Sequence, residues 1–260
     1  MAAHVDRSIC QPYRRWLHLC TEVPATSPPA VADRSSSNSK PPLQHPSLLS
    51  SVAGTPSTSD LWQKLWTDPK SEELKAQALN TLFISGVGLG ILDPRIFGKY
   101  TVQDAVYCAK IANLWLNVSK NPNADAYLQD LARALSKKYL EVATEMLQWW
   151  QIQTDGVWLG EHAREYEQMV EESVKENPAY MLVATFPCLK LWPFLASTLE
   201  RKQRRNNMYA FWIEGNKQEG STIARVQNAI NRYAEKLDYA TALRLFHKGL
   251  QCEINFFNEP

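Results

Sequence analysis

The sequence predicts an all-α fold, a single compact bundle of helices that follows an N-terminal tail. After position 60 the apolar residues recur at helical spacing, and no segment alternates as a half-buried strand would. Turn sequences such as NPNAD and TDG divide this part of the chain into segments of helical length. About 200 residues follow the tail, and this length is sufficient for one sizeable core.

The first 60 residues differ in composition from the rest of the chain. They contain eleven serines and eight prolines without an apolar period, so we expect residues 1–60 to be a disordered tail. A transit peptide is the alternative, because such peptides are rich in Ser and Arg but poor in acids. The tail has five basic and four acidic residues, which favours a plain extension and a cytoplasmic protein over an organellar one.

Residues 61–260 are expected to form one domain of seven or eight helices, with breaks where cap and turn residues occur. Asp60 is a good N-cap for the first helix, the glycines of SGVGLGILD end it, and the Asp93-Pro94 pair starts the second. The expected helices run over about 60–85, 93–119, from NPNAD to about 153, 160–175, 179–205, a short one near 209, one ending near 236, and a last one ending near 257.

Charge and cysteine usage exclude several classes of function. The tail contains five of the 28 Lys and Arg residues and four of the 27 Asp and Glu residues, so 23 of each remain in the domain. We therefore expect no nucleic-acid partner and no anionic membrane partner. Five cysteines without a CxxC pair are typical of a reducing compartment. The domain has only two histidines, His162 and His247, so we expect no metal site.

Two carboxylates lie on faces that are otherwise apolar. Asp104 falls within a helical stripe of aromatic residues, and Glu253 falls within a similar stripe of the last helix. Burial would raise the pKa of either carboxyl group towards values suited to acid–base chemistry. A hydrogen bond or a salt bridge of purely structural character would explain each residue equally well.

Cys188 lies in the apolar run AYMLVATFPCLKLWPFLAS, directly after Pro187 and five residues before Pro193. Lys190 and the two prolines favour a buried helix over a membrane span. We expect the helix to bend near Cys188, because each proline removes a helical hydrogen bond. Taken alone, a cysteine in such a run is more often a core residue than a nucleophile.

Four motifs in order resemble the TenA, or thiaminase II, family, which has a heme-oxygenase-like all-α fold. They are GILDPRIFGKYTVQDAVY, FPCLKLW, YAFWI and the closing EINFF, and the resemblance covers most of residues 61–260. The family acts on pyrimidines derived from thiamin in thiamin salvage. The resemblance therefore implies a hydrolase that needs no cofactor, takes a small pyrimidine substrate and forms a homo-oligomer, a dimer or tetramer.

The resemblance also implies roles for particular residues. Cys188 matches the nucleophile, and Glu253 matches the glutamate that handles the proton of a ring nitrogen. The substrate-binding positions are Asp104, Tyr107, Tyr166 and Trp192. Trp192 replaces a tyrosine that the family often has, Asn216 replaces another, and Pro193 is a further departure.

Three functions remain open at this point. The first is an aminopyrimidine aminohydrolase that works by addition of Cys188 and elimination of the leaving group. The second is an altered relative that binds a small heteroaromatic ligand without turnover. The third is an oxidase of the PqqC type, which shares the fold.

Overall fold

The fold is seen in a computed structural model, which describes residues 60–259. The predicted tail lies outside the described residues apart from Asp60. The described residues form only helices, as the sequence predicts. These are α2 (Leu61–Thr67), α3 (Pro69–Leu79), α4 (Leu82–Leu89), α5 (Pro94–Val118), α6 (Ala126–Trp150), α7 (Glu161–Glu176), α8 (Tyr180–Glu200), α9 (Ala210–Asn216), α10 (Ser221–Arg232) and α11 (Tyr239–Asn258), with 3-10 turns η1 (Thr154–Gly156) and η2 (Ala234–Lys236).

The single helix expected over 60–85 is wrong, because the structure has three helices there. Pro69 occupies the first turn of α3, and its missing N–H ends α2 two residues earlier. Thr81 caps α4, which continues through the glycines that predicted a break and ends at Gly90. Gly90 has a φ of +71°, the left-handed conformation that commonly ends a helix.

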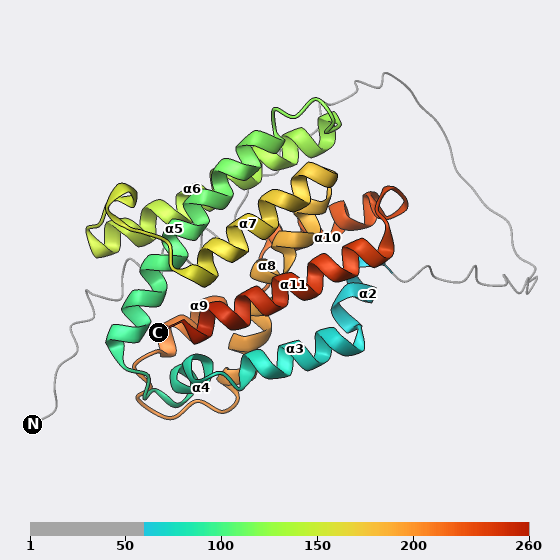
Figure 1. Ribbon diagram of the computed structural model, residues 1–260. Coiled ribbons are helices and arrows are strands. Elements are labelled where there is room, and N and C mark those ends of the chain that lie inside the picture. Colours follow the sequence, from blue (N-terminus) through green and yellow to red (C-terminus); the bar gives the residue numbers. More distant parts are fainter. Residues whose placement is uncertain (1–59, 260) are drawn as a thin grey trace, which may run out of the picture. The chain divides into compact units, whose positions relative to one another are not determined.

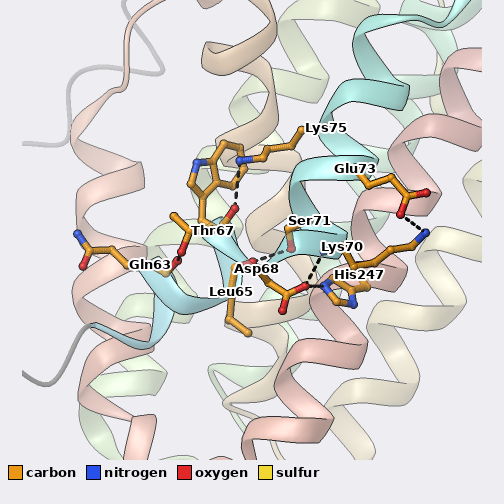
Figure 2. Close-up of polar contacts among 10 residues, drawn as sticks. Gln63, Leu65, Thr67, Asp68, Lys70, Ser71, Glu73, Lys75 and His247 are labelled. Atoms are coloured by element: carbon orange, nitrogen blue, oxygen red, sulfur yellow. Dashed lines mark hydrogen bonds and ion pairs between the residues drawn. The ribbon is translucent and has the colours of Figure 1, made fainter.

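The corner between α2 and α3 contacts the last helix, α11, through polar side chains (Figure 2). Asp68 accepts a hydrogen bond from the backbone N–H of Lys70 at 2.9 Å and so caps α3. His247 of α11 places Nε2 2.9 Å from Oδ1 of the same carboxylate. The Ser71 hydroxyl donates to the Leu65 carbonyl at 2.7 Å across the corner.

The pair formed by α5 and α6 makes one side of the bundle (Figure 1). The two helices run antiparallel, since the Trp150 indole at the end of α6 donates to Thr101 near the start of α5 at 3.0 Å. On the other side, α11 packs against α8, α3 and α7. This arrangement brings α5, α6, α8 and α11 around one interior region.

Helix α8 is the apolar centre of the bundle. Among the described helices it is the one long and apolar enough to cross a membrane, with a mean hydropathy of 1.4, yet 67% of that segment is buried inside the protein. The helix continues through Pro187 and Pro193 without interruption. Lys190 forms an ion pair with Glu219. The prediction of a buried helix is confirmed.

Candidate active site

A cavity of about 120 Å³ lies between α5, α6, α8 and the start of α10. Asp104 and Cys108 of α5 lie one turn apart in its wall, and Cys188 and Trp192 of α8 do the same. Tyr139 of α6 borders the cavity as well. Three of the residues that the sequence singled out, Asp104, Cys188 and Trp192, therefore line one space.

Asp104 is a carboxyl group in a largely apolar environment. Burial raises its pKa to about 7, and a hydrogen bond from the Cys108 thiol, with Sγ 3.9 Å from Oδ1, acts in the opposite direction. Asp104 therefore exchanges between its protonated and ionised forms near neutral pH. Such a group can accept a hydrogen bond or donate one to a polar ring edge.

Glu253 lies deeper, with only 2% of its surface exposed, and it does not border the cavity. Burial is the largest cause that raises its pKa to about 8, and the charge of Asp104 adds to the effect. Polar contacts with Tyr166 and Cys188 act in the opposite direction. The structure thus brings Asp104, Cys188 and Glu253 together from three separate helices.

Cys188 connects the cavity to these buried polar groups. Its side chain is partly exposed in the cavity wall and lies beside the Glu253 carboxyl group. The Tyr139 hydroxyl is a further neighbour. Burial, and then the nearby Cys188 and Cys108, raise the pKa of Tyr139 well above its usual value, so this hydroxyl stays protonated. It is a donor that can stabilise negative charge on the sulfur.

Sequence reasoning missed Tyr139. A signal was present, because Leu135, Tyr139, Val142 and Met146 follow each other at helical spacing along one face of α6. A tyrosine on such a face is ordinary, however, since its ring is apolar and its hydroxyl usually finds a partner. Only the position of Cys188 across the cavity makes Tyr139 a candidate functional residue.

Tyr107 and Tyr166 form a layer behind the cavity. Their rings stack with centroids 4.8 Å apart and an interplanar angle of 29°. Both side chains are buried, and neither borders the cavity. Tyr166 lies beside Glu253, and neither the Tyr107 nor the Tyr166 hydroxyl has a hydrogen-bond partner among the described residues. A direct role of these two tyrosines in substrate binding stays a prediction.

Aromatic rings form much of the remaining wall. The ring centroid of Trp192 lies 4.9 Å from that of Trp212 and 5.8 Å from that of Tyr100. The Asn216 amide, also in the wall, donates to the Trp212 carbonyl at 2.8 Å. These flat surfaces suit a planar aromatic ligand. Residues 60–259 contain no group of three or more His, Cys, Asp or Glu side chains placed to hold a metal ion.

The fold and the cavity define the class: an all-helical protein with an aromatic-walled cavity that two thiols and one carboxyl group line, and with a second carboxyl group buried behind them. No family model and no curated protein matches the chain. Solved structures do match. A TenA homologue from Pyrococcus horikoshii OT3 has 17% identity and a TM-score of 0.61, and the match covers 76% of this chain and 97% of that one.

Two further structures agree with this result. A TenA homologue from Pyrococcus furiosus has 16% identity and a TM-score of 0.64, with 76% of this chain and 98% of that one covered. A protein named for its likeness to TenA and thiaminase, from Sulfolobus solfataricus P2, has 18% identity and a TM-score of 0.57, with 76% and 92% covered. The chain therefore has the TenA fold, of the helical heme-oxygenase-like type.

Proposed function

We propose that this protein hydrolyses thiamin or a 4-aminopyrimidine derived from it, with Cys188 as the nucleophile. The observation that carries the proposal is the meeting of Cys188, Asp104 and Glu253, which come from α8, α5 and α11. The likeness in fold to TenA homologues supports the substrate class. The cavity is also close in volume to apolar cavities of about 150 Å³ that hold one benzene ring.

Each group has a defined task in this proposal. Asp104 binds the edge of the ring formed by a ring nitrogen and the exocyclic amine, and the aromatic wall stacks on the ring faces. With an aminopyrimidine, the Cys188 sulfur forms a bond to the ring carbon that carries the amine, while a ring nitrogen takes a proton supplied by Glu253. The Tyr139 hydroxyl stabilises the thiolate before it attacks.

The second half of the reaction restores the enzyme. The leaving group departs with a proton, water adds to the same carbon, and the carbon–sulfur bond breaks to return the thiol. With an aminopyrimidine the net change is exchange of the amine for a hydroxyl group, with one water consumed and one ammonia released. With thiamin the thiazole is carried by the methylene group on the ring, so the sulfur adds to the neighbouring ring carbon instead. The thiazole then departs from the methylene carbon, water adds to that carbon, and the carbon–sulfur bond breaks to return the thiol and release the hydroxymethylpyrimidine.

The test is an assay of the full chain with thiamin and with 4-amino-5-hydroxymethyl-2-methylpyrimidine in separate reactions. Chromatography follows the hydroxymethylpyrimidine released from thiamin and the 4-hydroxypyrimidine formed from the aminopyrimidine. We expect turnover in the wild type, none in Cys188→Ala, and near-normal turnover in Cys252→Ala. Cys252 is a matched control because it is a buried thiol that does not border the cavity, and burial raises its pKa to about 12. A wild type that binds the pyrimidine but never turns it over would identify a binding protein instead.

A further inference from the structure

The loop between α8 and α9, residues 201–209, lies against the end of α4. The Asn207 amide in this loop donates to the Val87 carbonyl of α4 at 2.9 Å. A Cβ atom at Gly90 would lie 2.8 Å from Oδ1 of Asn207, so the two segments are in direct contact. The orange loop that joins α8 to α9 passes beneath α4 at the lower edge of the bundle (Figure 1). The loop and α4 therefore form one piece of surface.

Basic residues are concentrated in the first half of this loop. They occur within the sequence ERKQRR and are Arg201, Lys202, Arg204 and Arg205. All four are exposed, and none of them forms an ion pair with another described residue. The adjacent acid, Glu200, is paired with Lys217 at 2.6 Å. Asp93, which follows α4, is paired with Arg95. The loop therefore has a local surplus of positive charge.

Exposed aliphatic side chains accompany these charges. Among the described residues ten large apolar side chains are exposed, and four of them belong to α4 and the two loops: Leu82, Leu89, Ile91 and Met208. Leu82 and Leu89 are seven residues apart and share one face of α4. Ile91 is 66% exposed and Met208 52%. Single exposed apolar residues are ordinary, whereas a group of them marks an interaction surface. We call these four residues and the four basic ones the α4 patch.

The α4 patch changes the interpretation of the charge of the domain. The expectation of no anionic membrane partner is based on equal numbers of acids and bases over the whole domain. Salt screens exposed charges beyond about 10 Å at 0.1 M, so a partner responds to the charges nearest to it and not to the sum. A neutral domain can therefore present a basic surface on one side.

The chemistry of the α4 patch distinguishes between possible partners. A second copy bound symmetrically would place the same four positive charges opposite each other, which is unfavourable. Single-stranded nucleic acids use aromatic side chains for base stacking, whereas the apolar residues of the patch are aliphatic. A bound peptide needs a groove, and neither the active-site cavity nor the cavity beside Gly160 includes a residue of the patch. An anionic bilayer suits both cations and protruding aliphatic side chains.

We propose that the α4 patch is a surface for reversible binding to an anionic lipid bilayer. The four basic residues contact the lipid phosphates, and Ile91 and Met208 enter the headgroup region beside them. Each Lys or Arg near such a bilayer contributes about fivefold in affinity, so four contribute several hundredfold. This inference goes beyond the proposed function and does not depend on it.

The test is flotation of the full chain with vesicles of equal parts phosphatidylcholine and phosphatidylserine, and with vesicles of phosphatidylcholine alone. We expect binding to the anionic vesicles at about 0.1 M salt, and at least tenfold weaker binding at about 0.5 M salt or without phosphatidylserine. The loop variant combines Arg201→Gln, Lys202→Gln, Arg204→Gln and Arg205→Gln. It should bind at least about a hundredfold more weakly. The pair Ile91→Ser and Met208→Ser should bind about tenfold more weakly.

Matched variants separate the patch from general effects of charge and hydrophobicity. The charge control removes four exposed cations from α6, α7 and α11, by changing to Gln the residues Arg133, Lys137, Lys175 and Arg244. The apolar control combines Leu116→Ser with Leu140→Ser, which are exposed residues of α5 and α6. Both controls should keep the affinity within about threefold. All variants contain the same N-terminal tail, so its contribution is constant. Thermal unfolding verifies that each variant is folded.

Several outcomes would overturn the proposal. They are equal flotation with neutral and anionic vesicles, unchanged flotation of the loop variant, and a charge control that loses as much binding as the loop variant. A wild type that does not bind vesicles but binds uridine-rich single-stranded RNA would show a nucleic-acid surface instead. None of these outcomes decides the proposed hydrolysis, because no residue of the α4 patch borders the active-site cavity.

Discussion

Gly249 of α11 provides the space into which the ring of Pro187 in α8 packs. A Cβ atom at position 249 would lie 2.7 Å from Cγ of Pro187 and 3.1 Å from the Ala184 carbonyl oxygen. The proline that precedes Cys188 is thus held against the helix that carries Glu253. This contact between α8 and α11 therefore affects the distance between the Cys188 thiol and the Glu253 carboxyl group.

Gly249→Ala should destabilise the protein although alanine is the better helix former. The gain in helix propensity is about 1 kcal/mol, whereas overpacking costs about 1–3 kcal/mol. We expect the free energy of unfolding to fall by about 1 kcal/mol in urea titrations, and activity to fall because α8 and α11 move apart. Gly156→Ala, where a Cβ meets open space, is the control. Unchanged stability and activity in Gly249→Ala would show that the helices adjust freely.

The stability of the fold should decrease as pH rises. The folded pKa of Glu253 is about 8 and that of Asp104 about 7, both above the ordinary values of 4.5 and 3.8. Between about pH 4 and pH 8 the folded state therefore binds more protons than the unfolded state, and stability falls with rising pH. Glu253→Gln should flatten this slope in unfolding experiments from pH 5 to 8.5. An equally steep slope in the variant would assign the effect to other groups.

Activity should decline on the alkaline side as Glu253 ionises. A general acid must be protonated, so we expect kcat to fall above about pH 8. Glu253→Gln, which cannot supply the proton, should lower kcat by about 10²–10⁴-fold and remove this alkaline decline. The measurement is a pH–rate profile of both proteins. A wild-type rate that keeps rising through pH 9 would argue that Glu253 does not act as the acid.

Tyr139→Phe should reduce turnover with little effect on folding. The variant keeps the ring that packs in the wall but removes the hydroxyl beside Cys188. Loss of a hydrogen bond to a charged sulfur costs about 1.5–3 kcal/mol, so kcat/KM should fall by about 10–150-fold. Tyr127→Phe, an exposed tyrosine of the same helix, should leave kinetics unchanged. Similar rates in the two variants would remove Tyr139 from the mechanism.

The α2–α3 corner should lose stability when Asp68 is changed to alanine. The substitution removes both the cap of α3 and the contact to His247, with an expected cost of about 1–2 kcal/mol. Asp68→Asn keeps the cap and should lose less. Thermal unfolding of both variants measures the difference. Equal losses would mean that the charge, and not the cap, is what matters at this corner.

The sequence was sufficient to predict the all-α fold class, and it singled out three polar residues that the structure brings together beside the cavity. Asp104, Cys188 and Glu253 stand out because a polar residue on an apolar face requires a reason. Tyr139 does not stand out, because tyrosine is ordinary on amphipathic helices. Its place beside Cys188 depends on which helix faces meet, and helical periodicity does not specify this.

The break at Asp68-Pro69 was missed for a different reason. The same dipeptide at Asp93-Pro94 was correctly interpreted as a cap followed by the first helical residue. At position 68 the apolar period continues on both sides of the break, so the pattern resembles one long helix. At this position the Asp-Pro pair, as an N-cap followed by the first helical residue, predicts the helix boundary better than the apolar periodicity does.

The apolar character of α8 has a consequence for how the protein is made. When α8 is complete during synthesis, 58 residues up to and including Asn258, and so all of α11, have still to be added. At typical elongation rates this takes roughly 3–12 s. For that interval a segment with the length and hydropathy of a membrane span lacks the helix that covers it. The nascent chain is therefore most open to aggregation around the very helix that carries the thiol, until α11 emerges and closes over it.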